Sequence, residues 1–219
     1  MKKTLLSLLL LCTLGACNDN DGDYAEYMDF VTVETDATAA GYHFRMDDGK
    51  SLYPGDITRV GAYDAVQGQR ALLYFSLLAE RVEGFDYNAA IYAIHDIYTG
   101  TTRLIDDDEL AALPDDPMLV FESRLRNGYL TLRVAYPVVD NSKHNFQLAI
   151  PRSAVPTAPD YLDAELRHDA GDDTPGDPAY CYISFPLDEA LPLLEGRQGI
   201  SLRIRISDDE VRILRIDAR

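Results

Sequence analysis

Hydrophobic and polar residues alternate with a period of two along most of this chain, and helical periodicity is nearly absent. This pattern is typical of strands that bury at least one face. In the first half, the strands expected at 71–78 and 89–98 are apolar on both faces, which favours a closed barrel that also packs against a second unit. Five strands within about 80 residues fit a small barrel of the OB type. These strands are expected at residues 27–34, 42–46, 51–53, 71–78 and 89–98.

The second half predicts a separate antiparallel β-sandwich. Asn127-Gly128 lies between two β-prone runs, and this dipeptide favours a tight hairpin turn. Several further half-apolar runs follow, as in a sandwich of short strands. A short helix is expected at 106–113, with acids at its start and Pro114 and Pro117 after it. We therefore expect an all-β fold, with an OB-type barrel at 27–110 and a β-sandwich at 111–219.

The N-terminus resembles a bacterial lipoprotein signal. Lys2 and Lys3 precede an apolar run at residues 5–14, which is too short to cross a bilayer. The run ends in Leu14-Gly15-Ala16-Cys17, which resembles a lipobox. This resemblance implies a signal peptide at 1–16, acylation of the Cys17 thiol, and anchorage in the outer membrane. The alternative is an ordinary secretory signal that happens to contain a cysteine.

Residues 17–26 are expected to form an acidic, flexible tether, since positions 18–23 are all Asn, Asp or Gly. These acids also resemble the export signals that follow the lipid cysteine in Bacteroidetes surface lipoproteins, which leaves display on the cell surface open. A calcium loop of the EF-hand type is excluded. Counted from Asp19, its sixth position is Tyr24 where glycine is needed, and its twelfth is Phe30 where an acid is needed.

The amino-acid composition mainly excludes some classes of protein. The 219 residues include 37 acidic and 20 basic side chains, for a net charge of −17. Nucleic acid is not an expected partner, because its binding depends on Lys and Arg that neutralise phosphates. The chain is 47% hydrophobic, enough to bury a core, and its three cysteines are too few for a disulfide-stapled scaffold.

Candidate chemistry is sparse. The four histidines, His43, His95, His144 and His168, lack the spacing of a zinc motif. His95 and His168 lie among apolar neighbours, so both are expected to be hydrogen-bonded core residues. Cys181 is expected to be a buried free thiol. The sequence therefore assigns no catalytic residue and no cofactor or metal site.

Acidic side chains leave two further options open. The loop that carries Asp169, Asp172, Asp173 and Asp177 is the best calcium candidate, and the alternative is a polar hairpin loop. With so many carboxylates, counting alone does not exclude the acid/base pair of a glycosidase. Sugar binding would have to use some of the 14 tyrosines, because tryptophan is absent.

The whole chain resembles the NigD-like family of Bacteroidetes lipoproteins. The resemblance rests on the lipobox at Cys17, the turn at Asp48-Gly49, Gly68-Gln69-Arg70 before a long apolar strand, the Asn127-Gly128 hairpin, and Leu166-Arg167-His168 before a Gly/Asp loop. It implies an N-terminal OB-type barrel and a C-terminal β-sandwich. The family name reflects association with a bacteriocin gene cluster, and the resemblance carries over no activity and no catalytic residue.

The sequence thus predicts a lipid-anchored envelope protein that is not an enzyme and needs no cofactor. It would act as a binding or accessory module for a protein or glycan partner. The alternative is a hydrolase of extracellular polysaccharide or peptide, with a carboxylate pair in the groove between the two domains.

Overall fold

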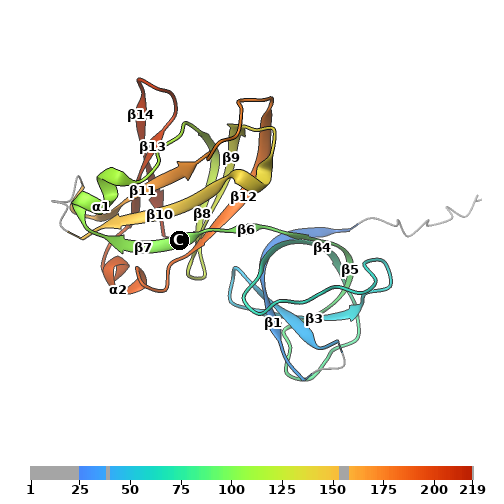
Figure 1. Cartoon of the computed structure of the whole chain (residues 1–219). Coiled ribbons are helices and arrows are strands. Elements are labelled where there is room, and N and C mark those ends of the chain that lie inside the picture. Colours follow the sequence, from blue (N-terminus) through green and yellow to red (C-terminus); the bar gives the residue numbers. More distant parts are fainter. Residues whose placement is uncertain (1–24, 38–39, 153–157, 219) are drawn as a thin grey trace, which may run out of the picture.

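The computed structural model describes residues 25–37, 40–152 and 158–218. Two all-β units lie side by side and are joined through β6 (Figure 1). The first is a closed five-stranded barrel in the order β1-β2-β3-β5-β4, which confirms the OB-type expectation. Its strands are β1 (Tyr27–Thr35), β2 (Tyr42–Met46), β3 (Ser51–Asp56), β4 (Arg70–Leu77) and β5 (Tyr87–Asp96).

The second unit is a β-sandwich of two sheets, also as expected. One sheet has the order β14-β13-β11-β10-β7 and the other β6-β12-β9-β8. The strands are β6 (Tyr98–Thr99), β7 (Thr101–Ile105), β8 (Leu119–Arg126), β9 (Tyr129–Pro137), β10 (Asn145–Pro151), β11 (Tyr161–Asp169), β12 (Pro178–Pro186), β13 (Gly199–Arg205) and β14 (Val211–Asp217). Three short helices complete it: α1 (Asp107–Ala112), the 3-10 helix η1 (Asn141–Lys143) and α2 (Leu191–Leu194).

Two expectations about the sandwich need correction. Its sheets are mixed, because β7 pairs in parallel with β10, β11 with β13, and β6 with β12. The boundary also lies earlier than residue 110, since β6 and β7 complete the sandwich sheets and α1 packs on β10. Alternation marks a strand but not the direction of its neighbour, so neither feature was visible in the pattern.

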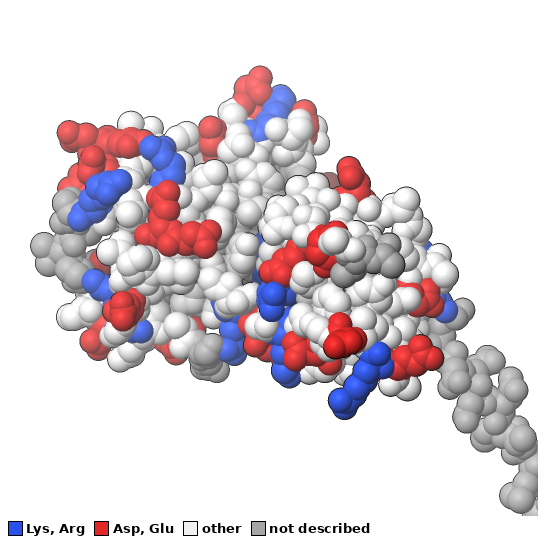
Figure 2. All heavy atoms as spheres, turned by 90° about the horizontal axis from the view of Figure 1, so that it is seen from below, with Lys and Arg blue, Asp and Glu red and all other residues white. Residues whose placement is uncertain are grey.

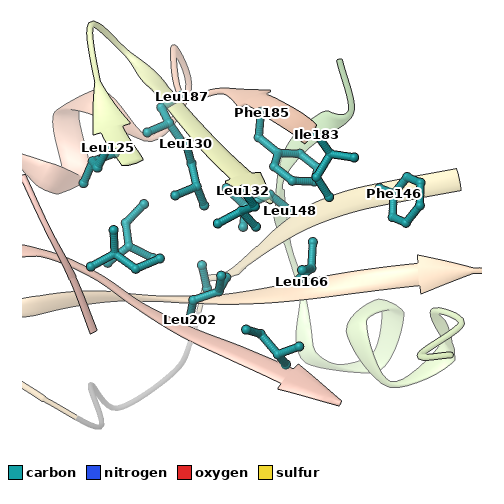
Figure 3. Close-up of a cluster of buried hydrophobic side chains, with 14 of the residues drawn as sticks. Leu125, Leu130, Leu132, Phe146, Leu148, Leu166, Ile183, Phe185, Leu187 and Leu202 are labelled. Atoms are coloured by element: carbon teal, nitrogen blue, oxygen red, sulfur yellow. The ribbon is translucent and has the colours of Figure 1, made fainter. Parts of the chain in front are cut away.

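The sandwich core is built as the alternation predicts. Leu130 and Leu132 from β9 face the opposite sheet, as do Ile183 and Phe185 from β12 (Figure 3). Residues of β10, β11 and β13 meet them, and all of these side chains are almost fully buried. Each such side chain stabilises the fold by about 1.5–3 kcal/mol relative to exposure.

The β4 strand explains why its sequence is apolar on both faces. Leu73 and Phe75 point into the barrel, whereas Leu72 points outward. There, Leu72 forms a small buried cluster with Phe30 and Ile97, and Tyr182 of the sandwich packs against it. The barrel therefore packs against the second unit, as the pattern predicts.

Charged side chains of both signs are interspersed over the face in Figure 2, and red groups interrupt the blue ones. This face carries no continuous basic track of the kind that follows a nucleic-acid backbone. Among the described helices, none has the length and apolar character needed to cross a membrane.

Candidate functional site

The site of interest is a groove where the barrel meets the sandwich. It encloses about 280 Å³, close to the lower end of the range for ligand pockets. The barrel side and the connection to the sandwich contribute Leu72, His95, Asp96, Ile97 and Tyr98. The sandwich side contributes Tyr136, Asn141, His144, Phe146, Cys181, Tyr182 and Ile183.

The end of β5 positions the barrel side of this groove. Ile97 is buried and donates its backbone N–H to the Arg70 carbonyl at 2.8 Å, which holds the chain against β4. Its neighbours Asp96 and Tyr98 point the other way by strand alternation and remain exposed. The Tyr98 ring packs edge-on against Phe146, with the two ring centres 5.4 Å apart.

Four side chains of the groove keep unused hydrogen-bonding capacity. Asp96 accepts a bond from the Tyr63 hydroxyl at 2.7 Å through one oxygen, which leaves its second oxygen available. Asn141 accepts from Tyr136 at 2.5 Å and keeps its N–H₂ donors. Within the described part of the chain, neither His95 nor the Tyr98 hydroxyl makes a hydrogen bond. The groove thus combines aromatic and aliphatic walls with donors and acceptors.

A buried polar chain extends inward from His144, which lines the groove. His144 Nδ1 lies 2.8 Å from His168 Nε2, and His144 Nε2 lies 3.1 Å from Asp173 Oδ2. Backbone N–H groups of Val139 and Asp140 donate to Asp173 and, with His144, hold the pKa of its carboxyl well below the usual range. Burial, together with the neighbouring His144, lowers the pKa of His168. The contacts to His168 and Asp173 therefore hold the His144 ring in the groove wall, while His168 Nδ1 has no hydrogen-bond partner among the described residues.

The Cys181 thiol also lines the groove, 3.8 Å from the Tyr136 hydroxyl. It is free and half-buried, so the expectation of a fully buried thiol is only partly met. Burial raises the pKa of Cys181, which keeps the sulfur protonated and weakly nucleophilic at neutral pH.

A buried ion pair within the barrel lies where the barrel meets the sandwich. Arg70 Nη2 lies 2.8 Å from Asp47 Oδ1, and both side chains are almost fully buried. The Arg70 guanidinium also stacks on Tyr129 of the sandwich, 4.4 Å from the ring centre. Asn127, in the β8–β9 turn, donates to the Met46 carbonyl at 3.4 Å. Both Gly68-Gln69-Arg70 and Asn127-Gly128 therefore have a structural role at the domain junction.

A second feature adjoins the groove on the outer face of the β8–β9–β12 sheet. Tyr180 and Phe121 are 62% and 51% exposed, and their ring centres are 5.7 Å apart. Leu119 and Tyr180 lie in one cross-strand row, in which each pairs with Ala135 from an opposite side. We call Leu119, Phe121 and Tyr180 the aromatic platform.

The remaining sequence candidates lie as follows. Cys17 is outside the described residues. His43 is at the far side of the barrel, where it contacts Asp36 and lies 2.8 Å from Glu34. His95 is exposed, contrary to expectation, because the strand end turns it into the groove. His168 is a hydrogen-bonded core residue, as expected.

Acidic side chains of the loop at 169–177 make contacts within the protein. Asp169 accepts from the Gly171 backbone, Asp172 pairs with Lys143 at 3.0 Å, and Asp173 contacts His144. Over the described residues, no cluster of three His, Cys, Asp or Glu side chains is arranged to hold a metal ion. These contacts match the polar-loop alternative.

Solved structures share the architecture. A protein of unknown function from Bacteroides vulgatus ATCC 8482 superposes with a TM-score of 0.74 at 19% identity, over 88% of this chain and 90% of its own. A NigD-like immunity protein from Bacteroides caccae ATCC 43185 gives 0.61 at 24%, over 86% and 90%. A candidate lipoprotein from Bacteroides fragilis NCTC 9343 gives 0.64 at 14%, over 88% and 97%. Among curated proteins, none matches the chain.

Two family descriptions match successive parts of the sequence. The NigD-like N-terminal OB domain matches residues 30–97, and the NigD-like C-terminal beta sandwich domain matches residues 102–218. Their junction coincides with the passage from β5 to β7, as the sheet topology requires. The chain therefore belongs to the NigD-like family.

Proposed function

We propose that this protein is a lipid-anchored envelope module that binds a partner in the interdomain groove and does not cleave it. The observation that carries the proposal is the convergence of His95, Asp96, Tyr98 and Asn141, each with free hydrogen-bonding capacity, on one hollow between two domains. Binding pockets combine apolar walls with a few such polar groups, which fix the orientation of the ligand.

The chemistry of the groove supports binding over hydrolysis. A glycosidase needs two carboxylates on opposite sides of the scissile bond. Among the described residues that line the groove, only Asp96 carries a carboxylate. Both ring nitrogens of His144 are already engaged, and the Cys181 thiol has a raised pKa. The groove thus favours the non-catalytic function over the hydrolase alternative.

The proposed partner is a protein or a glycan of the cell envelope. The solved structure from Bacteroides caccae is named a NigD-like immunity protein, a name compatible with a protein partner. Capture from intact cells by the purified protein, together with a glycan array, tests both classes. We expect Asp96→Asn to weaken capture and Asp208→Asn, at an exposed and distant position, to leave it unchanged. Equal capture by both variants, or turnover of any polymer, would contradict the proposal.

The location is part of the same proposal. The lipobox ending at Cys17 supports anchorage in the outer membrane, and the acids that follow support display on the surface. The related Bacteroides fragilis structure is named as a candidate lipoprotein. We expect Cys17→Ala to move the protein from the membrane to the soluble fraction, and its retention in membranes would argue against the anchor. Protease treatment of whole cells should degrade the wild-type protein, whereas full protection would place it on the periplasmic side.

A further inference from the structure

The outer face of the β8–β9–β12 sheet consists of successive cross-strand rows. Ser184 and Thr131, bonded to each other at 3.0 Å, form an almost completely buried row next to that of Tyr129, which stacks on Arg70 of the barrel. The next row contains Tyr182, Arg133 and Glu122, and the third contains Tyr180, Ala135 and Leu119. The face therefore emerges from under the barrel within a few residues and ends in the aromatic platform.

A bulge in β8 makes this face unusually rich in side chains. The pairing register shifts between Val120 and Glu122, so that Phe121 and Glu122 both lie on the outer side. Without the extra residue, alternation would direct Glu122 toward the core. The bulge thus places an aromatic ring in the platform and a carboxylate in the row beside it.

Tyr182 connects the platform to the groove. It lines the groove, its ring packs against Phe30 of the barrel at 5.0 Å, and its hydroxyl donates to Glu122 at 3.3 Å. Glu122 in turn accepts from Arg133 at 2.8 Å. Tyr180 lies two residues along the same strand, about 6.6–6.8 Å away. Adjacent units of one polymer chain can therefore reach both surfaces.

We infer that the ligand is a polysaccharide chain, with one sugar unit in the groove and its neighbours stacked on Tyr180 and Phe121. This inference rests on the proposed function of the groove. A sugar ring has a flat C–H face and a rim of hydroxyls. The surface matches both, with two adjacent exposed aromatic rings beside the polar groups of Tyr182, Glu122 and Arg133.

The negative charge of the protein argues against an anionic polysaccharide as the ligand. The net charge of −17 repels a polyanion, and Asp96 and Glu122 add local negative charge along the proposed path. The chain is therefore neutral or carries amino groups. An extended peptide fits less well, because it would pair with the backbone of an edge strand such as β12, which β6 pairs only at Ile183 and Ser184, and would then lie along the edge of the sheet and not across Tyr180 and Phe121.

Calorimetric titration of the full-length protein in detergent tests the inference. The probes are hexamers and dimers of three sugars: glucose in cellulose linkage, glucosamine in chitosan linkage, and the anionic galacturonate. We expect a neutral or amine-bearing hexamer to bind at least tenfold more tightly than its dimer, and galacturonate to bind weakly. Tyr180→Ala should reduce hexamer affinity about five- to tenfold and leave dimer affinity unchanged. Tyr27→Ala, a change at an exposed tyrosine of the barrel that lies outside the groove and the aromatic platform, is the control.

Three results would overturn the inference. The first is equal affinity for hexamer and dimer, and the second is an unchanged hexamer affinity in Tyr180→Ala. The third is the absence of binding to any of the sugars while capture from cells still depends on Asp96. That last result would leave the proposed function standing and assign the groove to a protein. If instead Asp96→Asn captured the partner from cells as well as the wild-type protein does, the proposed function itself would be refuted.

Discussion

The ion pair at the domain junction allows the most quantitative prediction. Arg70 is fully buried and faces Asp47, whose side chain is 3% exposed. Arg70→Met keeps the aliphatic bulk but leaves the Asp47 carboxylate buried without its partner. Removing one member of a buried pair costs about 3–5 kcal/mol. A typical domain is stable by only about 5–15 kcal/mol, so the variant should lose a large share of its stability.

The same reasoning predicts a specific rescue. Replacing both partners with apolar residues removes the uncompensated charge, so Arg70→Met with Asp47→Val should cost less than Arg70→Met alone, by about 2 kcal/mol or more. Urea unfolding followed by tyrosine fluorescence measures these differences. Arg212→Met removes an exposed ion-pairing arginine and should change stability by less than about 0.5 kcal/mol.

The pH dependence gives an independent test. Burial raises the pKa of Asp47 even beside Arg70, and loss of the guanidinium should raise it further. The folded state then binds a proton that the unfolded state releases, so stability falls as the pH rises above about 4. Arg70→Met should therefore cost less at pH 5 than at pH 8. A cost below 1 kcal/mol at pH 8, or a double variant no better than the single one, would refute this account of the junction.

Three further predictions concern the sandwich. Because the pKa of His168 is lowered in the folded state, the unfolded chain binds a proton at this residue at a higher pH than the folded protein does. The free energy of unfolding should therefore decline as the pH falls below about 6.5, and denaturant titrations should find a weaker decline in His168→Gln. Gly100→Ala would place a Cβ 2.4 Å from the Phe185 ring and 2.7 Å from the Phe146 carbonyl, so its melting temperature should fall well below that of the wild-type protein. The fall should also exceed that of Gly196→Ala, where the added Cβ meets no atom and the cost is limited to the positive φ of 76°. Leu132→Ala should cost about 2–5 kcal/mol of unfolding free energy, and a loss below 1 kcal/mol would contradict the packing shown in Figure 3.

Much of the fold could be predicted from local patterns because each strand carries its own signal. The alternation through Leu130, Leu132 and Val134 marks β9 and its buried face, and Asn127 with Gly128 marks the turn before it. Strand direction is set by how distant segments pair, so the parallel β11–β13 contact had no local signature. The same limit explains why residues 98–110, which contain β7, are assigned to the barrel by the sequence pattern.

The candidate site was less predictable because its parts are far apart in sequence. Asp96 and Asn141 come from different domains, and neither has a local pattern that marks it. His144 and His168 meet only because β10 and β11 are neighbours, and that register also pairs Phe146 with His168. The apolar surroundings of His95 suggested burial, whereas the residue lies at a strand end that opens into the groove. The excess of tyrosine over tryptophan was the one available hint of an aromatic surface.

A photo-cross-linking measurement tests the central claim, that the interdomain groove is the binding site. A benzophenone side chain replaces Tyr98 in the groove or, as the control, Tyr27 on β1, which has similar exposure and does not line the groove. After irradiation of intact cells, the account predicts a discrete adduct with an envelope component from position 98 and none from position 27. The same adducts from both positions, or none from position 98, would contradict it.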